Sequence, residues 1–333
     1  ASRQIPAAFR VALTGTPIEN RLEDLWSLFN LINPGLLGTR QSFQKRFAAI
    51  SAPAPGGENE ENASEAQSAA RQALRSLVRP FILRRTKSEV LAELPPRTEQ
   101  RIDVELPDDE RAFYEALRRA ALASLEAAKE DDASRKFNIL TELTKLRRAC
   151  CAPALVDPET ALSGAKLSAF MDLVSELVQG GHKALVFSQF VGCLTEARKR
   201  LDAAGHAYQY LDGSTPERER KSRVAAFQSG AGDLFLISLK AGGQGLNLTA
   251  ADYVIHLDPW WNPAVEDQAS DRAYRLGQKR PVTVYRLVAR GTVEESILRL
   301  HRSKRALAAD VLNGADVPLS ESELLELIRG ERD

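Results

Sequence analysis

The second half of the chain alternates between short apolar runs and longer segments whose apolar residues recur with helical spacing. Short apolar runs bounded by polar residues predict strands, and the periodic segments predict helices. The predicted strands are residues 184–187, 208–211, 234–237, 253–257 and 282–288, and the predicted helices are residues 167–178, 194–203, 218–227 and 265–276. This alternation predicts an α/β fold, with a parallel sheet covered by helices on both faces.

Polar residues follow several of these strands at the point where each strand ends. The carboxyl ends of parallel strands meet at one edge of a sheet, and ligands of such folds bind along that edge. We therefore expect a binding site there. The polar residues at the strand ends are Ser188, Gln189, Asp212, Gly213, Ser214, Thr215, Ser238, Lys240 and Asp258.

The first part of the chain predicts fewer regular elements. Residues 10–13 form a short apolar run that predicts a strand, and residues 22–32 have the apolar spacing of a helix. Residues 51–68 are rich in Ala, Pro, Gly, Ser and Glu and lack a core-forming pattern. That composition predicts a mobile surface insertion.

Further helices are predicted in the middle and at the end of the chain. Residues 108–151 predict long amphipathic helices. Residues 292–308 predict a basic helix, and residues 319–328 a short acidic helix that Ser320 would cap. The apolar stripes of the long helices are expected at Phe113, Leu117, Leu122 and Leu125, and at Leu140, Leu143 and Leu146.

A glycine-rich segment follows the predicted strand 234–237. Gly242, Gly243 and Gly245 allow positive φ and let a ligand approach the backbone closely. Consecutive N–H groups in such a loop can bind an anion, and Lys240 adds a cation beside them. The alternative is a tight turn that binds nothing.

Two arginines and a glutamine share one face of the last predicted helix. Gln268, Arg272 and Arg275 are spaced i, i+4 and i+7, and the planar guanidinium group suits phosphate oxygens. The alternative is a solvated face on which Asp267 and Asp271 are the ion-pair partners. The glycine-rich segment and these arginines both come shortly after strands, which favours phosphate chemistry.

Several motifs, in order, carry a resemblance to a known family. They read Ser-Leu-Lys-Ala-Gly-Gly-Gln-Gly-Leu-Asn-Leu at 238–248, Asp-Pro-Trp-Trp-Asn-Pro at 258–263 and Gln-Ala-Ser-Asp-Arg-Ala-Tyr-Arg-Leu-Gly-Gln at 268–278. They resemble the last motifs of the SWI/SNF-type ATPases, the DNA-translocating branch of the superfamily-two helicases. Leu-Thr-Gly-Thr-Pro-Ile-Glu-Asn at 13–20 resembles the third motif of that family. The resemblance implies RecA-like lobes.

The resemblance also implies roles for individual residues. Arg272 and Arg275 resemble the arginine fingers that reach the γ-phosphate of ATP, which typically contribute ~10³–10⁵ in rate. Gln268, Gly243 and Gly245 would join them at the nucleotide, and Thr14, Gly15 and Thr16 would link the nucleotide site to the DNA side. The DNA-backbone contacts that it implies are Ser188, Gln189, Gly213, Ser214, Lys240 and Trp261.

Two features of the sequence do not follow directly from this resemblance. The alternative for Trp260 and Trp261 is a structural role in the core or at a corner of the fold. In addition, Cys150-Cys151-Ala152-Pro153 has Ala where the family has His, which weakens any structural role for that histidine.

The resemblance predicts five regions. Residues 1–50 would be the tail of a first ATPase lobe, and residues 51–75 a mobile insertion. The others are residues 76–165 as an inter-lobe bridge and helical protrusion, 166–291 as the second RecA-like lobe, and 292–333 as a brace helix and acidic tail.

The distribution of charge along the chain is more informative about binding partners than the net charge. Lys+Arg and Asp+Glu both number 45, so the net charge is zero. Residues 272–305, however, hold eight Arg and two Lys against Glu294 and Glu295, a net charge of +8. Such a segment is typical of polyanion binding, although a solvated basic helix is the alternative.

Cysteine usage and hydropathy indicate the setting. The three cysteines lack metal-ligand spacing, so we expect no metal site in this chain and a reducing, cytoplasmic location. That location would be nucleoid-associated in a prokaryote or nuclear in a eukaryote. No apolar run of about 18 residues and no signal peptide is present, which predicts no membrane segment.

No Gly-x-x-x-x-Gly-Lys-Ser/Thr motif occurs in the sequence, which begins at Ala1 close to a motif. We therefore expect a preceding lobe to hold ATP and Mg²⁺. The favoured hypothesis is the C-terminal half of an ATP-driven double-stranded-DNA translocase, working as a monomer and inactive without that lobe. The alternatives are a non-catalytic nucleic-acid or partner-binding module and, third, a sugar-nucleotide transferase, which would not explain the paired arginines.

Overall fold

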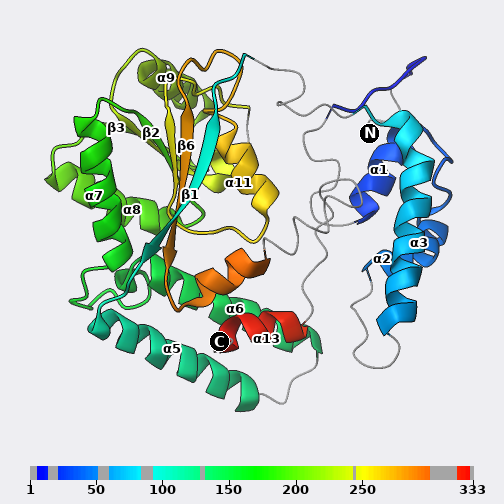
Figure 1. The fold of residues 1–333 in the computed structure, drawn as a ribbon, viewed down its shortest axis with the longest axis horizontal. Helices are drawn as coiled ribbons and strands as arrows, with labels where there is room; N and C mark the ends of the chain where they lie inside the picture. Colours follow the sequence, from blue (N-terminus) through cyan, green and yellow to red (C-terminus); the bar gives the residue numbers. More distant parts are fainter. Residues whose placement is uncertain are drawn as a thin grey trace. The chain divides into compact units, whose positions relative to one another are not determined.

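The computed structural model describes residues 6–13, 22–51, 60–83, 93–127, 132–242, 245–300 and 321–330 (Figure 1). The chain divides into two compact units. Unit 1 comprises Ala1–Thr86 with His301–Ser320, and unit 2 comprises Lys87–Leu300 with Glu321–Asp333.

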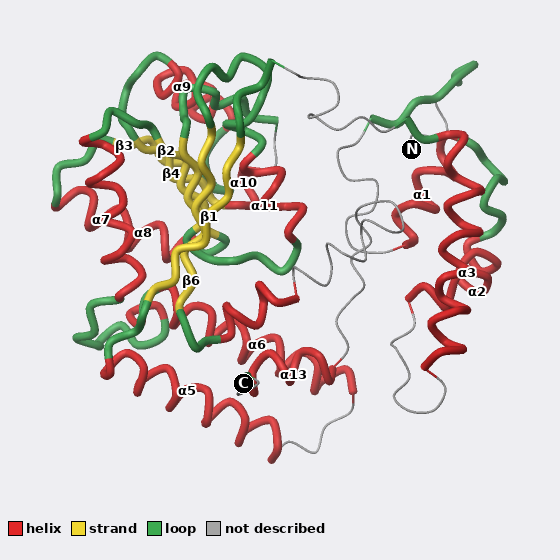
Figure 2. Tube along the Cα trace, viewed as in Figure 1, coloured by secondary structure: helices red, strands yellow, loops and turns green. Residues whose placement is uncertain are grey.

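The described part of unit 1 is helical (Figure 2). Helix α1 spans Leu22–Ile32, as the sequence predicts, and is followed by α2, Arg40–Ser51, and α3, Glu60–Val78. A short 3₁₀ helix, η2, covers Arg79–Phe81. The three α-helices bury one common core, whose members include Leu25, Phe29, Phe43, Phe47, Leu74 and Val78.

One prediction for this unit was wrong, and another is tested only in part. Residues 10–13 form no strand, and Phe9, Val11 and Leu13 are 82%, 67% and 94% exposed. A strand needs a partner for its backbone groups, and the described residues of unit 1 offer no other strand. The predicted insertion is helical from Glu60 onward, because Ala, Glu, Gln and Arg favour helix and α3 buries Leu74 and Val78. Its mobility stays a prediction.

Some predictions for this unit fall outside the part of the chain that the structure describes. These are Thr14, Gly15, Thr16 and residues 52–59.

Unit 2 is built on a six-stranded parallel sheet with the strand order β1-β6-β5-β2-β4-β3 (Figure 1). All five predicted strands are present. Their bounds are Ala184–Ser188 for β2, Tyr208–Leu211 for β3, Leu234–Ser238 for β4, Tyr253–His256 for β5 and Val282–Ala289 for β6.

The sixth strand, β1, Arg97–Val104, was not predicted from the sequence. It pairs with β6 over its whole length, from Arg97 opposite Val282 to Val104 opposite Ala289. Its residues are mostly polar and exposed, so they lack the apolar run that predicts a strand. β1 therefore extends the sheet from within the segment 76–165, and the predicted region boundaries remain predictions.

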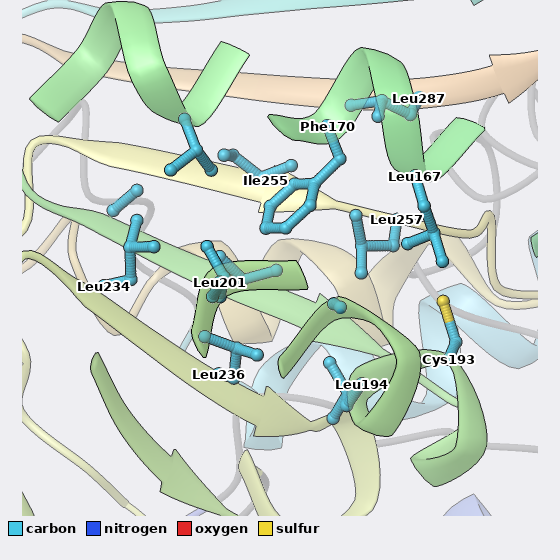
Figure 3. Close-up of a cluster of buried hydrophobic side chains, with 14 of the residues drawn as sticks. Leu167, Phe170, Cys193, Leu194, Leu201, Leu234, Leu236, Ile255, Leu257 and Leu287 are labelled. Atoms are coloured by element: carbon cyan, nitrogen blue, oxygen red, sulfur yellow. The ribbon is translucent and has the colours of Figure 1, made fainter. Parts of the chain in front are cut away.

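Successive residues of the strands face opposite sides of the sheet, as the two-residue period requires. On one side, α7, Ala165–Gln179, and α8, Val191–Ala203, cover a core that contains Leu167, Phe170, Leu194, Ile255 and Leu287 (Figure 3). On the other side, α9, Glu217–Gln228, α10, Leu239–Gly242, and α11, Pro263–Ser270, cover a second core. The predicted α/β arrangement with two covered faces is confirmed.

The long helices 108–151 are confirmed as α5, Asp108–Ala127, and α6, Asp132–Cys151. Leu125, Leu143 and Leu146 of the predicted stripes are buried, whereas Leu140 is 40% exposed. Helix α5 also buries Tyr114 and Ala121, which the stripes did not include. Helix α13, Glu321–Arg329, contacts both (Figure 1). Residues 293–300 are helical, whereas Ser320 and residues 301–308 lie outside the described residues.

Among the helices that the structure describes, none combines the length and the apolar composition that crossing a membrane requires.

Candidate nucleotide and DNA edge

The glycine-rich segment begins as a helical turn rather than as an open loop. Helix α10 directly continues β4, and Lys240 within it is exposed. Gly245 then adopts φ +59°, and an added Cβ there would meet no atom within 4 Å. Gly243 lies outside the described residues. The segment thus combines an exposed cation with a glycine in a left-handed conformation, and both features were predicted.

Helix α11 is shorter than the sequence predicts. It ends at Ser270, and residues 271–277 form a series of turns, in which Gly277 has φ +99°. Backbone hydrogen bonds to Ala269 O, Ser270 O and Ala273 O tighten this segment. Arg272 and Arg275 therefore do not continue a helical face from Gln268, and the spacing argument was wrong.

These turns are held against the loop between α10 and β5. The N–H of Leu248 donates to Arg272 O at 3.0 Å, and Arg275 Nη1 donates to Leu246 O at 3.3 Å. The buried Gln278 side chain donates to Thr249 O, Ala251 O and Ala273 O at 3.2, 2.8 and 3.1 Å. The glycine-rich segment and both arginines are therefore neighbours, although the helix predicted to align them ends too early.

The electrostatics of Arg272 are unusual for an arginine. The residue is 6% exposed, and its Nε has no hydrogen-bond partner among the described residues. Burial, and then the charge of nearby Arg275, lowers the pKa of the Arg272 guanidinium from its ordinary value. A buried cation next to a second cation favours the arrival of an anion.

The alternative raised from the sequence pairs these arginines with neighbouring aspartates. Instead, Arg97 on β1 forms ion pairs with Asp267 at 3.1 Å and Asp271 at 3.5 Å. Within the described parts of unit 2, neither Arg272 nor Arg275 has a carboxylate within 4.0 Å. Arg275 and Gln268 are both exposed. Within the described residues, β1 thus takes up both aspartates through Arg97, and neither guanidinium group forms an ion pair with a carboxylate.

A polar turn follows β3 at the carboxyl edge of the sheet. The Asp212 carboxylate accepts hydrogen bonds from the N–H and Oγ of Ser214 and from Thr215 Oγ1. These bonds, with that of Ser214 Oγ the largest cause, lower the pKa of Asp212 to about 2. Gly213 and Ser214 are exposed, beside a groove of about 430 Å³ whose lining includes Tyr210, Asp212, Ser214, Thr215, Glu219 and Arg223.

The other predicted DNA contacts are less exposed. Ser188 is fully buried, and its Oγ donates to Asp258 Oδ1 at 2.5 Å. Gln189 is half-buried, with its N–H on the same oxygen at 3.2 Å. Trp261 is also half-buried, and the guanidinium carbon of Arg147 lies 4.5 Å from the centre of its ring. The Ser188 hydroxyl therefore serves an internal contact here.

The basic segment 272–305 is less basic in space than in sequence. Arg280 pairs with Asp252 at 3.2 Å, Arg286 with Glu266 at 2.7 Å and Arg290 with Glu105 at 2.6 Å. These carboxylates lie outside the segment, so a count along the chain could not include them. The positive charge that residues 272–305 present to a ligand is therefore smaller than the sequence predicts.

The structure adds functional candidates that the sequence reasoning missed. They are Gln278, which fixes the arginine turns, and Arg220, which donates to Ala241 O at 3.1 Å and to Asp212 O at 3.4 Å. Gln278 was visible only as the end of a motif. No group of three or more His, Cys, Asp or Glu side chains able to hold a metal ion occurs in the described ranges.

Comparison with known proteins places this geometry in a family. The SNF2-related domain matches residues 1–155, and the Helicase conserved C-terminal domain matches residues 165–277. An "Uncharacterized ATP-dependent helicase" of Mycoplasma pneumoniae is 38% identical over 98% of this chain and 30% of its own length. The chain spans about a third or less of the length of the curated relatives that it matches.

Two solved structures from Sulfolobus solfataricus are similar over nearly the whole chain. The SWI2/SNF2 ATPase core domain is 32% identical with a TM-score of 0.61, and the match covers 100% of this chain and 67% of that one. The same core in complex with dsDNA is 32% identical with a TM-score of 0.59, covering 98% and 68%. Because fold, motif order and sequence agree along this whole length, the chain belongs to the SWI/SNF-type family of ATP-dependent helicase-like proteins.

Proposed function

We propose that this chain is the C-terminal half of an ATP-dependent double-stranded-DNA translocase. ATP and Mg²⁺ would be held mainly by an N-terminal lobe of the same protein that carries the phosphate-binding loop. The chain would supply arginine fingers and DNA-backbone contacts to that lobe. Relatives named ATP-dependent helicases, and a similar core solved in complex with dsDNA, support this function.

The observation that carries the proposal is the state of the two guanidinium groups. Arg272 is nearly buried and Arg275 is exposed, and neither has a carboxylate partner among the described residues. Burying a cation without a counter-charge is costly, so a site that keeps such a cation fits an anionic ligand. The residues present therefore fit a nucleotide phosphate.

The nucleotide, when bound, supplies the phosphoanhydride bond whose hydrolysis would drive the motor. The chain's own residues would orient the nucleotide phosphates and stabilise the negative charge on them. The turns after α11, fixed by Gln278, hold Arg272 and Arg275 in place before any ligand arrives. Positive charge fixed in advance needs no reorganisation when negative charge builds up. Gln268, Gly243 and Gly245 would complete the contacts on this side.

The DNA contacts would lie along the carboxyl edge of the sheet. Gly213, Ser214 and Lys240 are exposed there, and backbone N–H groups, hydroxyls and lysines bind phosphates without reading sequence. We include Gln189, Trp261 and Ser188 in this proposal, with Ser188 acting through its buried bond to Asp258. Thr14, Gly15 and Thr16 would couple the two sites.

The test is made on the complete protein with its N-terminal lobe. Arg272→Ala should lower DNA-stimulated ATP turnover by roughly 10³-fold, with little change in the Kd for duplex DNA. Arg272→Lys should restore little of the lost ATP turnover, because lysine lacks the planar guanidinium group. The matched control is Arg290→Ala, an exposed arginine paired with Glu105, which should leave turnover unchanged.

Unchanged turnover in both Arg272→Ala and Arg275→Ala would remove these residues as arginine fingers. A parallel loss of turnover and of DNA affinity would instead favour a nucleic-acid-binding role for the basic face.

A further inference from the structure

Arg147, near the end of α6, is a buried cation in a cage of aromatic rings. It is 1% exposed. Its guanidinium carbon lies 4.5 Å from the centre of the Trp261 ring, 5.5 Å from that of Phe190 and 5.9 Å from that of Trp260. Distances below about 6 Å are typical of cation–π contacts. One side chain from α6 thus touches three rings of the carboxyl edge.

Polar contacts tie the same guanidinium to that edge. Arg147 Nη2 donates to Pro259 O at 2.5 Å and lies 3.7 Å from Asp258 Oδ2. Asp258 Oδ1 in turn accepts from Ser188 Oγ and from the N–H of Gln189. Arg147 is therefore linked, through one carboxylate, to the ends of both β2 and β5.

This arrangement is not the one that stability alone would favour. Arg147 Nε, Asp258 Oδ2 and Gln189 Nε2 are buried without a hydrogen-bond partner among the described residues. Burial also raises the pKa of Asp258 to about 6. Buried ion pairs are weak sources of stability but can specify one arrangement among several. The cage fits a role in positioning better than a role in holding the core.

The residues that Arg147 fixes are those that the proposed function needs. Trp261 and Gln189 are half-buried at the edge where DNA would bind, and Ser188 supports the same turn. Helix α6, with α5 and α13 packed on it, lies across one end of the sheet in Figure 1. The cage is the contact that joins α6 to the turns after β2 and β5 at that edge.

We propose that Arg147 is a positioning residue for DNA engagement, an inference that rests on the proposed function. It holds Trp261 and the turn at Ser188–Phe190 in one arrangement and thereby joins the helical protrusion rigidly to the DNA-contacting edge. Loss of the guanidinium frees the tryptophan and the turn, while the nucleotide-facing arginines keep their own supports at Leu246, Leu248 and Gln278.

The first experiment compares Arg147→Met, Arg147→Lys and Leu143→Ala in the complete protein. Leu143 is a fully buried, purely apolar residue one turn earlier on α6, so its variant controls for lost stability. We expect Arg147→Met to raise the duplex-DNA concentration for half-maximal ATP turnover about tenfold, with the KM for ATP unchanged. Arg147→Lys should need a DNA concentration between those of wild type and Arg147→Met, since lysine keeps the charge but not the planar stacking. Leu143→Ala should lower Tm comparably and leave the DNA requirement unchanged.

The second experiment reads the position of Trp261 without any activity. The chain has three tryptophans, so Trp26→Phe with Trp260→Phe leaves Trp261 as the only tryptophan reporter. In that background Arg147→Met should shift Trp261 emission to longer wavelength and increase its quenching by acrylamide, whereas Leu143→Ala should change neither.

The outcomes separate the two proposals. If the unmodified protein shows no DNA-stimulated turnover, the proposed function fails, and the inference about DNA engagement fails with it. If DNA stimulates turnover but Arg147→Met behaves like Leu143→Ala, only the inference is overturned. An unchanged Trp261 emission in Arg147→Met overturns the positioning role whatever the activity.

Discussion

Single residues of this protein are tuned by burial, and His256 is the clearest case. Its ring stacks on Phe187 with centroids 5.6 Å apart, and its Nε2 lies 2.9 Å from Ser270 Oγ. The residue is 1% exposed, and burial lowers the pKa of the imidazole to about 4. The ring is thus neutral in the folded protein near pH 7.

The sign of the resulting pH dependence follows from proton uptake. The unfolded chain protonates His256 near pH 6.5, but the folded protein does so only near pH 4. The stability that the neutral ring contributes is therefore complete above about pH 6.5 and is lost as the pH falls towards 4. The loss should be roughly 3 kcal/mol.

The first prediction is that His256→Gln flattens this acid limb. Urea unfolding of wild type and variant at pH 7.5 and 4.5 gives the difference in unfolding free energy at each pH. That difference should favour the variant at the lower pH by roughly 2–3 kcal/mol relative to the higher.

Asp258 changes the free energy of unfolding with pH in the direction opposite to His256, so each variant is compared with wild type. Its folded-state pKa of about 6 lies above its ordinary value of 3.8. Its contribution is therefore greatest at acid pH and is lost as the pH rises through 6. Asp258→Asn should steepen the acid limb where His256→Gln flattens it, and equal pH profiles in all three proteins would contradict both assignments.

Between elements, Glu110 of α5 caps a different helix. Its carboxylate accepts from Gly164 N at 2.7 Å and from Ala165 N at 2.9 Å, at the start of α7. Gly164, the N-cap of α7, has no side chain to do this. Asp108, Asp109 and Glu110 read in the sequence as acids in the first turn of α5, yet the last of them is buried and serves a neighbour. A carboxylate at a helix N-terminus satisfies N–H groups and opposes the helix dipole.

The second prediction concerns this inter-helix cap. Glu110→Ala should lower the free energy of unfolding by about 1–3 kcal/mol, because it leaves buried N–H groups without an acceptor. Asp108→Ala is the control in the same turn, since Asp108 is exposed, and should change stability by less than about 0.5 kcal/mol. Urea unfolding of both variants makes the comparison, and similar losses in both would assign the effect to α5 itself.

At the scale of the whole chain, charge in space differs from charge in sequence. Arg280, Arg286 and Arg290 are each paired with a carboxylate, whereas Lys240 and Arg275 are exposed and have no carboxylate partner in the described ranges. Three arginines of the segment 272–305 are therefore already neutralised by carboxylates and are less available to phosphates.

The third prediction is that the chain alone binds duplex DNA weakly and hydrolyses no ATP. The slope of log Kobs against log salt should be about −2 to −4, as expected for a few phosphate contacts. Fluorescence anisotropy at several salt concentrations and a steady-state ATPase assay check both statements. Measurable ATP turnover by the purified chain would contradict the proposed division of labour with an N-terminal lobe.

The sequence by itself determined the central sheet and the family. Five strands can be predicted because buried parallel strands are continuous apolar runs. Three motifs in the right order identify the family. Both signals are local, so they can be seen without the fold. They also correctly grouped the glycine-rich segment with Arg272 and Arg275.

Only the tertiary structure decided how those residues are held. Arg97 lies 170 positions from Asp267, and Arg147 lies 112 positions from Pro259. The strand β1, the end of α11 at Ser270 and the aromatic cage around Arg147 all depend on such partners. Contacts between distant positions leave no periodicity in a single sequence, so five strands and the long helices could be predicted, whereas β1, the end of α11 and the contacts of Arg147 could not.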